Sequence, residues 1–251
     1  MNWLTDAHIH LSDVEFKPEL QFMLTAMEKM GLKACCVSMD YSSSIATLKL
    51  GEQSPLVLPF LGIHPEKANG DLESVVNLIM ENSNKISGIG EIGLDKTYVS
   101  DDADFNRQVN VFEKMLSLAE KLEKPISIHS RRTLEEIFSI LPSYHLKGVL
   151  LHWFAGNKKQ LQKAMDIGSY VSYGPAMVYS QDKQILLSLT EPSRILLETD
   201  GPVKFSKCFG YKTAQITFMP SVLFCASQIL GKRYDEMLEI VEKNTNSYLG
   251  I

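Results

Sequence analysis

The stretch Asp6-Ala7-His8-Ile9-His10 follows a short apolar start, Trp3-Leu4, and its two histidines determine how the other histidines and carboxylates of the sequence are interpreted. In a β-strand, residues two apart face the same side, so His8 and His10 point together while Ile9 faces the packed side. Two neutral imidazoles on one strand face can bind one metal ion. An isolated His-x-His is equally compatible with ordinary polar or core histidines, so the interpretation depends on histidines and carboxylates elsewhere in the chain.

Short apolar runs alternate with amphipathic segments along the whole sequence. After the first run, which ends at His10, strands are predicted at residues 33–39, 56–63, 86–92, 126–129, 147–152, 169–173 and 194–199. Helices are predicted at residues 17–30, 43–50, 71–82, 103–122, 132–141, 157–167, 181–189, 213–230 and 234–248. This alternation over 251 residues predicts an α/β fold, a (β/α)8 TIM-type barrel forming a single domain over residues 1–251.

The composition, 45% hydrophobic and 22% charged, is ordinary for a soluble globular protein. The net charge of -5 argues against a broad basic surface that coats nucleic acid, but a local phosphate site beside bound cations remains compatible with it. No apolar run is long enough to span a membrane, and the N-terminus does not resemble a signal peptide. We therefore expect a cytoplasmic protein without membrane association, and nothing in the sequence points to an obligate protein partner.

Five of the six histidines fall at the ends of predicted strands, and only His145 lies elsewhere. Two carboxylates, one on the fourth predicted strand and one after the eighth, fall in similar places. In a closed barrel the carboxyl ends of all strands share one rim, so side chains at these positions should converge on one pocket. The converging residues are His8, His10, His64, Glu91, His129, His152 and Asp200.

Without His64, the set still contains four histidines and two carboxylates. This number exceeds the three protein ligands plus water of a usual catalytic zinc site. It suits two divalent ions bridged by a carboxylate, about 3.5–4 Å apart. Ligands of nitrogen and oxygen without thiolate fit Zn, Mn, Co or Mg, and the sequence does not choose among them. The first ion is assigned to His8, His10, Glu91 and Asp200, and the second to Glu91, His129 and His152, with Glu91 as the bridge.

Asp200 and the bridging Glu91 are the predicted catalytic residues, with Asp200 as the general base toward an activated water. Glu198 shares the strand face of Asp200 and either orients a ligand or is a buried structural carboxylate. Arg131 is interpreted as a substrate-binding residue that reaches a phosphate, with a solvated loop charge as the alternative. His64 is either a second substrate-binding residue or an ordinary loop histidine.

The segment Gly88-Ile-Gly90-Glu-Ile-Gly93 matches the G-x-G-x-x-G pattern of dinucleotide sites. That pattern should open an apolar helix, whereas here the polar stretch Leu94-Asp95-Lys96-Thr97 follows. The metal interpretation accounts for Glu91 and the nucleotide interpretation does not. The sequence also lacks G-x-S-x-G and kinase signatures, so serine acyl transfer and kinase chemistry have no support.

Six motifs, in this order, resemble the TatD family of metal-dependent deoxyribonucleases within the amidohydrolase superfamily: DAHIHL, GIHPE, GEIGLD, ISIHSRR, LHWFAG and LLETDGP. They extend over residues 6–202, so the resemblance covers most of the chain. It implies a (β/α)8 barrel with a divalent metal centre and DNA as substrate. Carried over by position, the ligands of the family fall on His8, His10, Glu91, His129, His152 and Asp200, the set already obtained from the strand ends.

The sequence departs from the family pattern after the last predicted strand. An arginine and an Asn-Glu-Pro are usual there, whereas this chain has Lys-Phe-Ser-Lys-Cys-Phe-Gly-Tyr-Lys at 204–212. The departure bears on the substrate, because this segment lines the rim, and it leaves the metal ligands untouched.

The leading hypothesis is a two-metal hydrolase of DNA phosphodiesters, which basic residues near the rim favour. These are Arg131, Lys204, Lys207 and Lys212. The alternatives are a hydrolase of the same superfamily acting on an amide, ester or lactone, and a non-catalytic metal-dependent binding protein. The predicted base, Asp200, counts against the latter.

Overall fold

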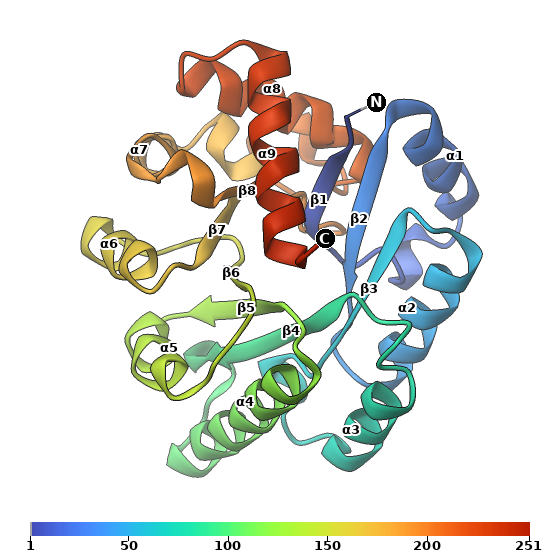
Figure 1. Ribbon diagram of the computed structural model, residues 1–251, viewed down its shortest axis with the longest axis vertical. Helices are drawn as coiled ribbons and strands as arrows, with labels where there is room; N and C mark the ends of the chain where they lie inside the picture. The colour runs from blue at the N-terminus through green and yellow to red at the C-terminus, as the bar shows by residue number, and fades with distance from the viewer. Residues whose placement is uncertain (1) are drawn as a thin grey trace.

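The computed structural model describes residues 2–251, and within this range eight strands follow one another around a nearly closed barrel (Figure 1). Each strand pairs in parallel with the next one along the chain. The predicted α/β barrel of the (β/α)8 type is confirmed. The strands are β1 (Leu4–Ile9), β2 (Leu32–Val37), β3 (Val57–Leu61), β4 (Gly88–Asp95), β5 (Ile126–Arg131), β6 (Val149–Leu151), β7 (Tyr170–Tyr173) and β8 (Ile195–Leu197).

Helices cover the outside of the barrel (Figure 1). They are α1 (Leu20–Met30), α2 (Tyr41–Gln53), α3 (Leu72–Glu81), α4 (Asp102–Leu122), α5 (Leu134–Ile140), α6 (Lys158–Asp166), α7 (Gln181–Leu189), α8 (Met219–Ile229) and α9 (Tyr234–Leu249). Across residues 2–251, no helix combines the length and the apolar character that crossing a membrane requires.

The helix predicted from residue 213 begins at Met219 instead, which is the largest error in the predicted helix bounds. Thr213 pairs with Lys204 in an antiparallel bridge, so its backbone is extended. A single 3-10 turn, Ile216–Phe218, follows before the helix starts with Pro220 in its first turn. Proline suits that position because the first helical amides need no partner within the helix.

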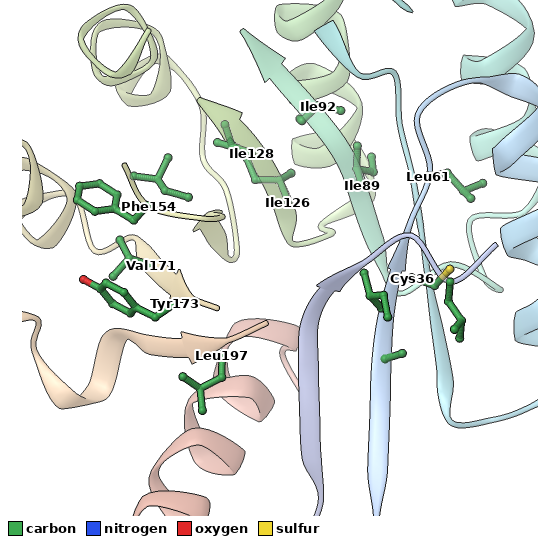
Figure 2. Packing of buried hydrophobic residues seen from close by; sticks show 14 of the residues in the cluster. Cys36, Leu61, Ile89, Ile92, Ile126, Ile128, Phe154, Val171, Tyr173 and Leu197 are labelled. Atoms are coloured by element: carbon green, nitrogen blue, oxygen red, sulfur yellow. The ribbon is translucent and has the colours of Figure 1, made fainter. Parts of the chain in front are cut away.

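Alternate strand residues build the packing between the barrel and its helices. On β5 these are Ile126 and Ile128, and on β7 Val171 and Tyr173, all of them buried in one large apolar cluster. Figure 2 shows members of this cluster on strands from β2 to β8. This is the outer face that the strand period of two requires when helices cover the sheet.

The remaining strand residues face the opposite way and become polar toward the carboxyl ends. On β8 the apolar Leu196 is followed two residues later by Glu198, and on β5 Ser127 is followed by His129. The apolar residues on this side form a second, smaller cluster, which includes Phe60, Leu150 and Leu196. Tyr248 of α9 packs among them and donates a hydrogen bond to the Ile126 carbonyl at the start of β5. The carboxyl end of the barrel is therefore left with polar inward-facing side chains.

Contacts between β1 and the segment after β8 complete the ring. The Asp200 amide donates to the His8 carbonyl at 3.0 Å, and the His10 amide donates to the Gly201 carbonyl at 2.8 Å. The buried Asp6 carboxylate accepts hydrogen bonds from both the amide and the hydroxyl of Thr199. These bonds fix the residues around His8 and Asp200 against each other, at the point where the barrel closes.

Candidate metal centre

Glu91, on β4, is the buried residue around which the predicted site is built. Its Oε2 atom lies 3.4 Å from His8 Nε2 and 3.2 Å from His10 Nε2. Its Oε1 atom lies 2.9 Å from both His129 Nδ1 and His152 Nε2. The two carboxylate oxygens thus face two different pairs of histidines, one from β1 and its end, the other from β5 and the end of β6.

Asp200 lies on the β1 side of Glu91. Its Oδ1 atom is 3.6 Å from His8 Nε2 and 3.8 Å from His10 Nε2. Asp200 has a left-handed backbone (φ 51°), a conformation that aspartate tolerates better than most residues. Burial, and then the nearby Glu198 carboxylate, raise the pKa of Asp200 well above its usual value. The structure thus brings together all six residues predicted as ligands, four imidazoles and two carboxylates.

The pKa of Glu91 shows how strongly the histidines act on it. Burial alone would raise this pKa, but the surrounding imidazoles, those of His64, His152 and His8 first, hold it well below its usual value. Glu91 is therefore an anion enclosed by nitrogen atoms, which is the charge state that a cation-binding carboxylate needs.

Asp95, the last residue of β4, fixes the orientation of His129. Its Oδ2 atom lies 2.8 Å from His129 Nε2, and an ionised carboxylate can only accept, so this nitrogen carries a proton. A neutral His129 would then turn the lone pair of Nδ1 toward Glu91 Oε1. Two acceptors 2.9 Å apart need a proton or another cation between them. Burial would lower the pKa of His129, but Asp95 and Glu91 outweigh it and raise the pKa to about 9.

His64 reaches the same carboxylate but in a different tautomer. Its Nδ1 accepts a hydrogen bond from the Glu66 amide at 3.2 Å, so in the neutral ring the proton is on Nε2. That nitrogen lies 3.6 Å from Glu91 Oε1 and 3.4 Å from His129 Nδ1. Burial lowers the pKa of His64 to about 4, which keeps the ring neutral. His64 therefore presents an N–H donor to the centre, whereas His129 presents an acceptor only when its ring is neutral.

The other two buried imidazoles differ in how they are supported from behind. His8 Nδ1 lies 2.8 Å from the Ser127 hydroxyl, so its Nε2 is the nitrogen that faces Glu91 and Asp200. His152 Nδ1 lies 3.9 Å from Glu198 Oε2. Within residues 2–251, neither His8 Nε2 nor His152 Nδ1 has a hydrogen-bond partner of good geometry. A buried nitrogen without such a partner is costly in a centre that binds nothing.

Glu198 is fully buried and accepts hydrogen bonds from the Trp153 amide and the Ser172 hydroxyl. Burial raises its pKa to about 8. It therefore combines the two interpretations drawn from the sequence, because it is a buried carboxylate in a structural network and also the acidic group nearest to His152 Nδ1.

The donor atoms have the spacing of metal ligands. Bonds of roughly 2.0–2.1 Å to a tetrahedral ion place ligand atoms roughly 3.3 Å apart. On the β1 side, the four nitrogen-to-oxygen distances run from 3.2 to 3.8 Å. Three overlapping groups have atoms close enough together to hold an ion: His8, His10 and Glu91; His8, His152 and Asp200; His64, Glu91 and His129. The residues present therefore fit divalent metal ions.

The basic residues predicted near the rim lie outside this cluster. Arg131 ends β5, pairs in register with Asp95, and has an exposed side chain. Lys204 is half-exposed and lies 3.6 Å from Glu15. Lys207 lies over the ring of Tyr179. Lys212 is exposed as well, so all four charges belong to the surface and not to the buried cluster.

Sequence reasoning missed the residues that support the ligands, namely Asp95 for His129 and Ser127 for His8. Each has the same signal in the sequence, since it lies an even number of residues from a ligand on the same strand. Asp95 was overlooked because the fourth strand was predicted to end at residue 92, whereas β4 continues to Asp95.

The chain is similar to known proteins over nearly its whole length. The family model described as "TatD related DNase" matches residues 5–250. TATDN3 of mouse is 32% identical over 256 residues, covering 96% of this chain and 86% of the mouse protein. An uncharacterized metal-dependent hydrolase of Methanocaldococcus jannaschii, MJ1582, is 27% identical over 243 residues, covering 96% and 94%. The crystal structure of YjjV, a TatD homologue of Escherichia coli K12, superposes with a TM-score of 0.90 at 23% identity, covering 99% and 98%.

Proposed function

This chain belongs to the TatD related DNase family of metal-dependent hydrolases, and from that premise we propose that it cleaves phosphodiester bonds of DNA with two divalent ions. The proposed ligands of the first ion are His8, His10, Glu91 and Asp200, and those of the second are Glu91, His129 and His152. Glu91 would be a ligand shared by the two ions, which would be Zn, Mn, Mg or Co.

One observation carries the proposal: the two oxygens of a single buried carboxylate face two separate histidine pairs. Oε2 of Glu91 is directed to His8 and His10, and Oε1 to His129 and His152. A carboxylate that bridges two ions needs this division. Bound divalent ions would supply Lewis acidity, which activates water as a nucleophile and neutralises charge that develops on a phosphate.

The residues of the chain complete the reaction. Asp200 accepts the proton of the attacking water and passes it to the leaving oxygen. His64 directs its Nε2–H toward the centre and would donate a hydrogen bond to a substrate oxygen beside Glu91. Arg131, exposed at the end of β5, would contact a phosphate further out.

DNA is proposed as the substrate because of the family and because of charge. The family model carries the description DNase. The net charge of the chain is -5, so attraction of a polyanion must come from the bound ions and from a few local lysines and Arg131. We expect such an enzyme to bind a strand at its mouth and not to coat a duplex.

A substrate panel tests the proposal. The purified chain, supplied with Mn or Mg, would be given a single-stranded oligodeoxynucleotide, a small phosphodiester such as bis(p-nitrophenyl) phosphate, and a set of amides, esters and lactones. Hydrolysis of the two phosphodiesters is the expected result. Hydrolysis of lactones or amides, with the oligonucleotide left intact, would contradict the proposal and favour the alternative chemistry of the same fold.

Asp200→Asn tests the assignment of the base. This change keeps an oxygen ligand but removes the group that takes the proton, so we expect turnover to fall by about 100- to 10,000-fold. Metal content should stay nearly intact. A variant with wild-type turnover would show that another group acts as the base.

A further inference from the structure

An open groove of about 720 Å³ lies beside the mouth of the barrel. One wall is the connection from β1 to α1, which contributes Glu19. The other is the segment after β8, residues 203–218, which includes the stretch 204–212 where this sequence departs from the pattern of its family. The residues that line it are Glu19, Lys204, Tyr211, Lys212, Thr213, Gln215 and Phe218.

Both walls begin at the metal centre. The β1–α1 connection leaves the barrel directly after His10, and the other wall leaves it directly after Asp200. Close packing holds the two together at Gly201, where an added Cβ atom would lie 2.3 Å from the Ala214 carbonyl oxygen and 2.9 Å from Phe16 Cζ. A chain-like substrate whose reacting group sits at the centre would pass over this contact to reach the groove.

The lining combines an aromatic ring with cations. The side chain of Tyr211 is 60% exposed although it is large and apolar for most of its surface. Lys212 beside it is exposed, and Lys204 lies across the bridge to Thr213. The acidic Glu19 accepts a hydrogen bond from the side-chain amide of Gln215, with Nε2 2.7 Å from its Oε2. Lys204 also lies 3.6 Å from Glu15. An exposed ring with lysines nearby is the pattern on which bases stack while the lysines contact the backbone phosphates.

The backbone that presents Tyr211 is unusual. Phe209, Gly210 and Tyr211 all have positive φ, at 53°, 63° and 60°. This conformation is costly for the two aromatic residues, by about 1–2 kcal/mol each. The ring of Phe209 stacks on that of Phe218, with centroids 4.1 Å apart, and this contact holds the turn in place. A turn that is costly in itself, and that places an aromatic ring in solvent, is better explained by binding than by stability.

We propose that this groove binds the single-stranded DNA flank that leads away from the scissile bond. Tyr211 stacks against a base, and Lys212 and Lys204 contact phosphates. The inference rests on the proposed function, because it takes the scissile phosphate to lie at the metal centre. It adds a binding site for nucleotides beyond the reacting one, and it assigns a role to the divergent segment 203–218.

Tyr211→Ala tests the groove in two independent ways. The first readout is binding of a fluorescent oligo(dT) by anisotropy, without added metal. The second is KM for an unlabelled oligonucleotide compared with KM for bis(p-nitrophenyl) phosphate, which is too small to reach the groove. Loss of one base stack should weaken binding of the oligonucleotide and raise its KM by about 5- to 150-fold. The values for the small ester should not change.

Further variants separate stacking and charge from damage to the fold. Tyr211→Phe should behave as wild type because it keeps the ring. Lys212→Glu, at an exposed position that is safe for folding, should weaken oligonucleotide binding and flatten its dependence on salt. Tyr41→Ala at the start of α2 and Lys85→Ala, whose lysine is paired with Glu52, are matched controls at other exposed positions and should change nothing.

The outcomes distinguish this inference from the proposed function. If the wild-type chain cleaves DNA but Tyr211→Ala and Lys212→Glu bind and cleave the oligonucleotide normally, the groove is not a DNA site and the proposed function stands. If both substrates are affected equally, Tyr211 acts on the fold or the centre and the inference is wrong. If the chain binds oligo(dT) through Tyr211 but hydrolyses no phosphodiester, the groove binds single-stranded DNA, but both the proposed function and the assignment of the groove to the flank of a scissile bond fail.

Discussion

The two sides of Glu91 differ in how their histidines are held. On the β1 side, His8 and His10 face Oε2 at 3.4 and 3.2 Å, and His8 is backed by the neutral hydroxyl of Ser127. On the side of β5 and β6, His129 and His152 both face Oε1 at 2.9 Å. His129 is backed by the Asp95 carboxylate at 2.8 Å, whereas His152 Nδ1 lies 3.9 Å from Glu198, beyond hydrogen-bond distance.

The difference indicates how the two proposed ions should bind. A carboxylate that accepts a hydrogen bond from one nitrogen of a histidine fixes the tautomer of the ring. It also makes the other nitrogen a stronger metal ligand than a hydroxyl partner would. The shorter distances around Oε1 are those of hydrogen bonds, so protons compete for this side when no metal is bound. We therefore expect the β5–β6 side to bind its ion more tightly and with a stronger dependence on pH, and the β1 side to bind its ion more weakly.

Glu91→Gln should give the largest effect because it acts on both sides at once. The amide cannot bridge two ions, since one of its two heteroatoms is a donor with no free lone pair. We expect both ions to be lost or bound far more weakly, and kcat/KM to fall at least about 1,000-fold. Metal content after gel filtration and activity on an oligonucleotide measure this. If one ion stays fully bound, the two sides do not share Glu91.

His64→Asn tests whether His64 is a ligand of the ion beside Glu91 Oε1 or donates a hydrogen bond to the substrate there. Asparagine is a good N-cap, so it can replace Nδ1 as acceptor for the Glu66 amide while being too short to reach Glu91. We expect kcat to fall by about 100-fold, as on removal of one donor to a developing charge. Metal content should be unchanged, and loss of an ion would show that His64 is a ligand.

Asp95→Asn and Ser127→Ala compare the two supports directly. Asp95→Asn should weaken the ion on the His129 side by about 10- to 100-fold. Ser127→Ala should weaken the ion on the His8 side by less, because it removes a neutral partner. Titration of the metal-free chain with Mn, followed by calorimetry, gives both affinities. Equal losses from the two changes would remove the distinction between the two sides.

The smallest expected effect is on the free energy of unfolding, through Lys183 near Glu198. Burial lowers the pKa of Lys183, which lies near Glu198, from 10.5 to about 8. Between these two pH values the folded chain binds fewer protons than the unfolded chain, so the free energy of unfolding rises with pH, by at most about 1.4 kcal/mol per pH unit. Lys183→Met should abolish this rise in denaturant titrations at pH 8 and above. A slope that survives the change would mean that Lys183 is not its source.

The convergence of the six proposed ligand residues was predictable because the strand period places residues two apart on the same face of a strand. His8 and His10, and separately the ends of the later strands, follow from apolar runs that stop at a histidine or carboxylate. A barrel brings those ends to one rim whatever the exact bounds. Errors of a few residues in the strands therefore did not affect the prediction that these side chains converge.

The supports and the groove were less accessible to sequence reasoning. Asp95 looked like a turn residue after a glycine-rich strand, and only the pairing of β4 with β5 shows that the strand continues. The segment 203–218 has no periodicity. Contacts between distant residues shape it, such as the bridge from Lys204 to Thr213 and the stack of Phe209 on Phe218, and local preferences do not encode such contacts.

The central claim is that Glu91 lies between two metal ions at the mouth of the barrel. Anomalous scattering from crystals grown with Mn tests it most directly. We predict two peaks per chain, one on each side of Glu91, with Oε2 and Oε1 each directed to one of them. A single peak, or two peaks without Glu91 between them, would contradict it.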